Sequence, residues 1–210
     1  MRISFLGHAS FLITTEGKKI LTDPFNEEVG YPLYEDEVDY VTVSHGHWDH
    51  AATDLLKGEF TAITTSGKHD FGNLVFTGIK SYHDTKKGAL RGENLIFIIE
   101  AEGIRIAHLG DLGHLLAADD IKKMGKIDLL LIPVGGTFTI NANEAITIVN
   151  ELKPRIVIPM HYDTPHLTFD LAPVEDFTQH YEVVVKKPEL DINLDNLDKV
   201  NKIILLDYLS

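Results

Sequence analysis

Three histidines and one aspartate lie within six residues, from His45 to His50, in the run His-Gly-His-Trp-Asp-His. The chain has 11 histidines among 210 residues. A random window of six residues would therefore hold roughly 0.3 histidines on average. Imidazole and carboxylate groups are the usual nitrogen and oxygen ligands of divalent metal ions in proteins. The run therefore predicts a metal-binding site.

The segments on either side of this run determine how its side chains can be placed. Residues 40–43 form a short apolar run rich in β-branched side chains, which indicates a buried strand. The first two histidines would leave this strand in nearly extended backbone and share one side. Residues 51–57 are expected to form a helix, so the chain must turn at Trp48 and carry the aspartate and the third histidine away. One loop would then serve two adjacent metal positions.

A strand-end H-x-H-x-D-H motif followed by a helix resembles the signature of the metallo-β-lactamase fold superfamily of metal-dependent hydrolases. The remaining motifs occur in the expected order, and the resemblance covers essentially all 210 residues. Asp23, in Leu-Thr-Asp-Pro, matches an acid that braces the metal-binding loop. His83, Asp111 and His161 match a further histidine ligand, a carboxylate that bridges two metal ions, and the last ligand.

The resemblance implies imidazole and carboxylate ligands around two divalent metal ions. The ligands of the first ion would be His45, His47 and His83. Those of the second would be Asp49, His50 and His161, with one oxygen of Asp111 to each ion. These donors suit Zn²⁺ best and also accept Mn²⁺ or Fe²⁺. The chain has no cysteine, so thiolate ligands and disulfides are excluded.

Two metal ions in one site are expected to support hydrolysis. Coordination lowers the pKa of water from ~15.7 to ~7, so a water shared by the ions would become a hydroxide near neutral pH. This hydroxide would attack an ester, lactone or related bond. Asp49, besides binding a metal ion, would orient the hydroxide and later carry a proton toward the leaving group.

Several residues outside the ligand set are candidates for contacts with the substrate. A basic segment follows His83, and its Arg91 is expected to bind an anionic group, while the lysines beside it are more typical of a solvated turn. His114 is expected to reach the substrate, with a solvated loop histidine as the alternative. His8 follows a glycine at a strand end, and either faces the site, as a supporting residue or a substrate contact, or is a structural histidine.

Three segments give a finer resemblance within the superfamily. Gly7-His8-Ala9-Ser10, Arg91-Gly92-Glu93-Asn94 and Gly110-Asp111-Leu112-Gly113-His114 look most like the branch that contains ascorbate-6-phosphate lactonase. Together with the basic segment, this favours a small anionic substrate. The alternatives are a phosphodiesterase or ribonuclease of the same fold, and a noncatalytic metal-binding scaffold.

The apolar runs predict an α+β protein, and the resemblance implies a four-layer αββα sandwich of the metallo-β-lactamase type. Asn141 with Glu144 predicts a capped helix start, and a further helix is expected near 173–180. With no linker or repeat, residues 1–210 are expected to form one domain. The expected strands are 2–6, 10–14, 19–22, 40–43, 61–64, 74–79, 95–100, 104–109, 128–132, 155–158, 183–185 and 203–206.

Composition restricts the class of partner. The formal net charge is −13, which opposes binding to nucleic acid because that affinity comes from clustered Lys and Arg. The first residues have too short an apolar run for a signal peptide, and no segment approaches the ~20 apolar residues of a membrane helix. A cytoplasmic enzyme with a small-molecule substrate is expected. The sequence does not indicate an oligomeric state.

Overall fold

The computed structural model describes residues 1–199 and 202–208, which build two mixed β-sheets. The strands of the first sheet, in spatial order, are β13 (Leu190–Asp191), β1 (Arg2–Gly7), β2 (Ser10–Thr15), β3 (Lys18–Thr22), β4 (Tyr40–Thr42) and β5 (Thr61–Ile63). Those of the second are β12 (Val184–Lys187), β14 (Ile203–Leu206), β11 (Ile156–Met160), β10 (Leu129–Pro133), β9 (Ile104–His108), β8 (Glu93–Ala101), β7 (Val75–Tyr82) and β6 (Gly67–Asp70).

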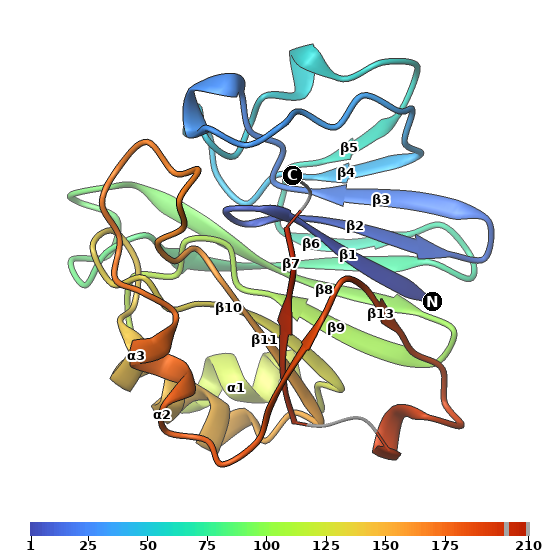
Figure 1. Cartoon of the computed structure of the whole chain (residues 1–210). Helices are drawn as coiled ribbons and strands as arrows, with labels where there is room; N and C mark the ends of the chain where they lie inside the picture. The colour runs from blue at the N-terminus through green and yellow to red at the C-terminus, as the bar shows by residue number, and fades with distance from the viewer. Residues whose placement is uncertain (200–201, 209–210) are drawn as a thin grey trace.

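The layers confirm the expected α+β sandwich. Helices α1 (Ala118–Met124), α2 (Ala142–Leu152) and α3 (Glu175–Thr178) gather on one side, beside β10 and β11 (Figure 1). The first sheet lies on the other side, and its outer face is covered by loops with the short 3-10 turns η1 (Glu27–Val29) and η2 (Thr53–Leu55). A third 3-10 turn, η3, spans Leu197–Lys199. The outer layer over the first sheet is therefore irregular.

The main hydrophobic core fills the space between the two sheets and beneath the helices. Side chains of both sheets join it, such as Phe11 from β2 and Phe97 from β8, both with 0% exposure. Burying such a side chain stabilises the folded state by about 1.5–3 kcal/mol. A smaller cluster, which includes Phe25 and Val41, lies under the loops that cover the first sheet. The two cores hold the sheet edges that carry the candidate site.

All the strands expected from apolar runs form, with ends shifted by a few residues. The start of α2 is also confirmed, because Asn141 and Glu144 form a reciprocal capping box. Strands β6 and β13 and helix α1 are not predicted from the sequence, because their side chains are mostly polar or exposed. The expected single domain over residues 1–210 stays a prediction, and residues 200, 201, 209 and 210 lie outside the described part of the chain.

The helix expected over residues 51–57 is wrong. Only the single 3-10 turn η2 forms there, without a capping side chain, and Leu56 is already extended. The amide of Ala52 donates to the carbonyl of Pro24 (2.9 Å), far away in the sequence, instead of joining a helical ladder. A helix of seven residues would make few internal hydrogen bonds, too few to compensate for losing the bond from Ala52 to Pro24.

Across residues 1–199 and 202–208, no helix is long and apolar enough to span a membrane.

Candidate metal centre

Strand direction brings most candidate residues to one edge of the sandwich. In the first sheet β1 and β3 run parallel to β4, since β2 pairs antiparallel with both β1 and β3. In the second sheet β7 runs parallel to β9, β10 and β11. The carboxyl ends of parallel strands meet at the same edge. The residues at or just beyond these ends are His8, Asp23, His45, His83, Asp111 and His161.

One carboxylate oxygen, Asp111 Oδ2, is the point where these side chains converge. It lies 3.1 Å from His83 Nε2, 3.3 Å from His50 Nε2 and 3.3 Å from His161 Nε2. The Nε2 atom of His45 is 4.0 Å away. Two ligand atoms that bind one Zn²⁺ tetrahedrally at ~2.0–2.1 Å lie about 3.3 Å apart. The spacing around Asp111 therefore suits ligands that share a metal ion.

A first group of ligand atoms comes from His45, His47 and His83, whose nitrogens all lie within 4.8 Å of one another. The rings of His45 and His47 have their centroids 4.5 Å apart, and those of His47 and His83 are 5.1 Å apart. His45 and His83 are buried, whereas His47 is exposed. This is the trio expected from the sequence for one metal ion.

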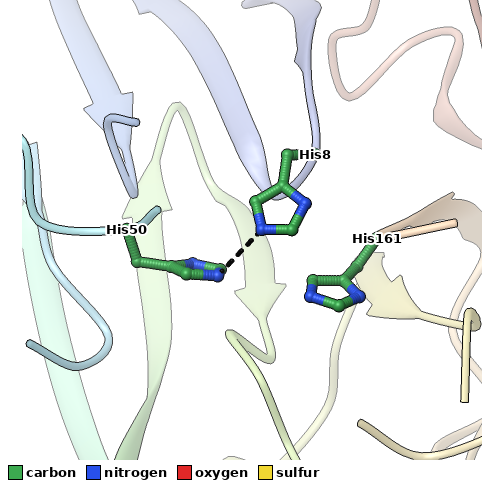
Figure 2. Close-up of side chains that lie close together, drawn as sticks. All are labelled: His8, His50 and His161. Atoms are coloured by element: carbon green, nitrogen blue, oxygen red, sulfur yellow. Dashed lines mark hydrogen bonds between the residues drawn. The ribbon is translucent and has the colours of Figure 1, made fainter. Parts of the chain in front are cut away.

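A second group differs in part from the expected trio. His50 and His161 are brought together, but the third nitrogen within 4.8 Å comes from His8 (Figure 2). The Nε2 atom of His8 lies 3.1 Å from His50 Nε2 and 3.2 Å from Asp49 Oδ2. Asp49 Oδ2 itself lies 3.7 Å from His50 Nε2. Asp49 is thus at the edge of this group, and His8 bridges it to the imidazoles.

A buried network fixes the protonation of two of these imidazoles. Asp23 Oδ1 accepts from the Ser44 amide (2.8 Å), and Oδ2 accepts from the Ser44 hydroxyl (2.5 Å) and from His50 Nδ1 (3.0 Å). Because the Ser44 hydroxyl proton is donated to Asp23, its oxygen accepts from His45 Nδ1 (2.9 Å). Both imidazoles therefore carry their proton on Nδ1, and the lone pair on Nε2 is left for a ligand.

Burial and neighbouring charges shift the pKa values of several histidines in this centre. Burial lowers the pKa of His45 to about 3. Burial and the neighbouring imidazole of His161 lower the pKa of His8 to about 4. Burial also lowers the pKa of His50, but Asp111 and Asp23 outweigh it and raise that pKa well above its usual value. A metal ion would compete with this proton on His50, so metal binding there should release a proton.

Two buried atoms test whether the residues fit a metal. His45 Nε2 and Asp111 Oδ1 have no hydrogen-bond partner among the described residues. Buried polar atoms almost always have a partner in native proteins. An imidazole lone pair and a carboxylate oxygen match the donors that Zn²⁺ takes. The two residues lie close together, since His45 Nε2 is 4.0 Å from Asp111 Oδ2. The residues fit a divalent metal site.

A cavity of 440 Å³ opens directly onto this centre. The residues that line it are His47, Trp48, Asp49, His83, Leu90, Arg91, Asp111, Phe138 and Phe169. Arg91, expected to bind an anionic group, is therefore at the cavity. Trp48, Phe138 and Phe169 were not identified from the sequence, because single aromatic residues are usually core and nothing marked these as exposed.

Asp84, the residue after His83, holds the loop that carries Arg91. Its Oδ1 accepts from the amides of Lys86 (2.6 Å) and Gly88 (3.0 Å), and its Oδ2 from those of Leu90 (2.9 Å) and Arg91 (2.8 Å). Burial raises the pKa of Asp84, but these four donors outweigh it and lower the pKa to about 2. One carboxylate thus fixes the backbone of the whole turn.

His114 differs from its expected contact with the substrate. Its Nε2 accepts from the amide of Tyr82 (3.2 Å), and its Nδ1 donates to the carbonyl of Leu115 (2.8 Å). Both ring nitrogens are therefore engaged by the backbone, and His114 is not among the residues that line the cavity. The histidine supports the loops on either side of it.

Comparison with known proteins places this geometry in a family. A family model described as a β-lactamase superfamily domain matches residues 2–161. A UPF0173 metal-dependent hydrolase from Pelotomaculum thermopropionicum is 36% identical over 198 residues, which cover 78% of this chain and 85% of the relative. A relative with the same description from Carboxydothermus hydrogenoformans is 29% identical over 216 residues, covering 89% and 96%.

A solved structure agrees with these relatives. The crystal structure of a candidate Zn-dependent hydrolase of the metallo-β-lactamase superfamily from Thermotoga maritima matches with a TM-score of 0.84 at 36% sequence identity. The match covers 99% of each chain. The resemblance drawn from the motifs, and the fold it implied, are confirmed.

We expect Asp84→Asn to loosen the turn that carries Arg91. An amide side chain has only one acceptor oxygen in place of the two that now hold four backbone N–H groups. Hydrogen exchange at Lys86, Gly88, Leu90 and Arg91, measured at pH 7, should become faster. The control is Asp70→Asn, since Asp70 accepts from the Gly72 amide and from Lys68 Nζ, both outside this turn, and it should leave the 86–91 amides unchanged.

The same carboxylate predicts a pH dependence in the parent. The pKa of Asp84 is lower in the folded protein (about 2) than its ordinary value of 3.8. The stability that the ionised Asp84 gives to the folded turn is therefore fully present above pH ~4 and is lost as the pH falls toward 2. Protection of these amides should follow that window. Equal exchange in Asp84→Asn and parent at pH 7 would contradict the role given to Asp84.

Proposed function

This chain belongs to the β-lactamase superfamily and is a metal-dependent hydrolase, and we propose that it cleaves an ester, lactone or related bond in a small anionic substrate. The observation that carries the proposal is the convergence of three imidazole nitrogens on Asp111 Oδ2 within 3.3 Å, at the floor of an open cavity. A structural metal site is normally closed, whereas a catalytic one keeps an accessible side. The finer resemblance to the lactonase branch stays a prediction.

We propose that the site holds two divalent ions, with Zn²⁺ favoured by the donor set. The ligands of the first would be His45, His47 and His83. Those of the second would be Asp49, His50 and His161, and Asp111 would contact both. Metal ions bound there would activate a water molecule near neutral pH and polarise the substrate oxygen.

The remaining roles belong to the protein's own side chains. Asp49 lines the cavity, and burial raises its pKa, but the contact with His8 and the charge on His50 outweigh this and lower it. It therefore stays ionised, so it could bind a metal ion, orient the attacking water, accept a proton from that water and pass this proton to the leaving group. His8 would hold Asp49 through Nε2, and Asp23 would hold His45 and His50 in the tautomer that ligation requires.

Two alternatives are less well supported. A nuclease or phosphodiesterase of this fold would have to bind a polyanion, and the net charge of −13 opposes that. A noncatalytic scaffold needs no open cavity with a cation beside the ligands, and here Arg91 lines that cavity.

We expect Asp111→Asn to reduce metal binding and hydrolysis more than Asp23→Asn. Asp111 contributes a charged oxygen at ligand spacing from three imidazoles, whereas Asp23 acts through His50 and Ser44 and would keep part of its hydrogen bonding as an amide. Loss of a group that only supports ligands typically weakens metal affinity about 10- to 100-fold. Metal content by elemental analysis, and Zn²⁺ affinity by chelator competition, should show a larger loss for Asp111→Asn.

The parent serves as the reference in this experiment, with up to two metal ions per chain expected. A parent that takes up neither Zn²⁺ nor Mn²⁺ on titration would overturn the metal site. Parent-like metal content and hydrolysis rates in Asp111→Asn would contradict the central position of this carboxylate.

We expect Arg91→Ala to reduce hydrolysis of anionic esters selectively. A hydrogen bond to a charged group contributes about 1.5–3 kcal/mol, so kcat/KM for an anionic ester should fall roughly 10- to 100-fold. A neutral ester of the same size should change little, and metal content should not change. Lys87→Ala is the matched control, because Lys87 lies in the same turn but does not line the cavity. Equal losses on both esters would show that Arg91 acts structurally.

A further inference from the structure

The cavity beside the metal centre has an unusual division of side chains. Four of its lining residues belong to the proposed ligand set, and one, Arg91, is a cation. The other four are all apolar, and they are Trp48, Leu90, Phe138 and Phe169. Outside the ligand set, the guanidinium is thus the only charged side-chain group among the described residues that line the cavity, and the indole N–H of Trp48 is the only other polar one.

Three of these four apolar side chains are exposed to solvent. Eight large hydrophobic residues are exposed in the described part of the chain, and three of them, Trp48 (47%), Leu90 (70%) and Phe138 (37%), line this one cavity. They come from three loops far apart in the sequence. Exposed apolar side chains that gather in one place mark binding surfaces, and binding pockets combine apolar walls with a few polar groups.

Phe169 joins the wall into a continuous aromatic surface. Its ring centroid lies 6.3 Å from that of Trp48 and 6.0 Å from that of Phe138, both in edge-on geometry. Its other neighbour is His8, 5.5 Å away and also edge-on. The aromatic wall therefore extends from the mouth of the cavity to the histidines of the metal centre.

The cation is part of this wall. The guanidinium carbon of Arg91 lies 5.5 Å from the centroid of the Phe138 ring, a cation–π distance, and its backbone is fixed by Asp84. Arg91 makes no salt bridge within residues 1–199 and 202–208. A positive charge held against an aromatic face, without a carboxylate partner, is available to a ligand that is both anionic and apolar.

A polyhydroxylated substrate would not match this surface. Its hydroxyl groups would face Trp48, Phe138 and Phe169, which offer no acceptor and only one donor, the indole N–H of Trp48, and burying polar groups without partners costs free energy. A phenyl-sized apolar group would instead replace water on the exposed rings. Because Arg91 stacks on Phe138, the anion and the apolar group must lie close together in such a ligand.

We infer that the substrate is an ester whose carboxylate and aryl group lie close together, as on one carbon atom, with the aryl group on Trp48, Phe138 and Phe169 and the carboxylate at Arg91. This rests on the proposed function and narrows its substrate from any small anion to an amphiphilic one. The 440 Å³ cavity is within the range of small-molecule sites.

Binding can be tested without turnover, because Trp48 is the only tryptophan of the chain and its fluorescence reports directly on the cavity. The probes are mandelate, lactate and gluconate, added to the Zn²⁺-loaded protein. All three are α-hydroxycarboxylates with the same metal-chelating group, and they differ in bearing a phenyl group, a methyl group or a polyol chain. We expect mandelate to bind at least about tenfold more tightly than the other two, from burial of the ring.

Variants locate the effect in the aromatic wall. Phe169→Ala leaves the Arg91–Phe138 pair in place and should weaken mandelate binding about 3- to 10-fold while leaving lactate binding unchanged. Phe71→Ala is the control, because Phe71 is a phenylalanine on the surface (42% exposed) that does not line the cavity. Metal content and thermal unfolding of each variant are measured, and Phe169→Leu, which keeps an apolar side chain, should restore part of the lost affinity.

Hydrolysis of O-acetylmandelate and O-acetyllactate separates this inference from the proposed function. These acetate esters are both anionic and differ only in the phenyl or methyl group, and kcat/KM should favour the mandelate ester by at least about tenfold. Equal binding of mandelate, lactate and gluconate, or equal hydrolysis of both esters, would overturn the amphiphilic substrate and leave the hydrolase in place. Selective mandelate binding without hydrolysis of either ester would support the aromatic subsite and count against ester hydrolysis.

Discussion

The site depends on one buried carboxylate oxygen, Asp111 Oδ2, which lies within 3.3 Å of imidazole nitrogens from three separate chain segments. A buried carboxylate is tolerated only when it is paired with positive charge and hydrogen-bonded. Here the pairing is shared, because the same oxygen faces His83 and His161 from the second sheet and His50 from a loop of the first. A cation bound at this point would therefore join the two sheets electrostatically. The shared oxygen also explains why a proton and a metal ion would compete for the same place, and why both sheets must end at the same edge.

The backbone is strained at three residues that surround the site. Asp23, His8 and His161 have φ angles of 40°, 55° and 53°, which non-glycine residues rarely adopt. Such conformations cost of order 1–3 kcal/mol each and persist only where surrounding contacts enforce them. One enforcing contact is a hydrogen bond from the His161 amide to the His8 carbonyl (2.7 Å), which ties the end of β11 to the turn after β1. This bond holds a strained residue of one sheet against a strained residue of the other. The two histidines therefore keep their relative positions although no covalent link or regular ladder joins them.

The sequence predicts features that are local or that follow from strand periodicity, and it predicts poorly those that depend on distant contacts. The run from His45 to His50 is readable because its ligands share one loop, and Asp111 and His161 because each follows an apolar strand. The helix expected after this run fails since Ala52 donates to the distant Pro24 carbonyl. The sequence predicts His8 only as a supporting, substrate-contacting or structural residue, although its Nε2 lies 3.1 Å from His50 Nε2, because that contact spans 42 positions of the chain. The sequence does not mark Phe138 and Phe169 as cavity residues, because the position of an aromatic side chain at a surface or in a core depends on the folded structure.

The division between metal centre and cavity wall follows from the kind of structure that carries each. Most of the proposed ligands stand at strand ends, where the sheets fix the backbone and where a change of one residue would alter the core. The wall is carried by loops at Trp48, Leu90, Phe138 and Phe169, which can vary with little cost to packing. Asp84 connects the two parts, since it follows His83 directly and its carboxylate holds the Arg91 amide. Arg91, the cation proposed to bind the anionic substrate, is thereby positioned from the end of β7, next to the proposed ligand His83, while the apolar surface around it is free to change. A family built in this way can keep one hydrolytic centre and alter the group that it accepts.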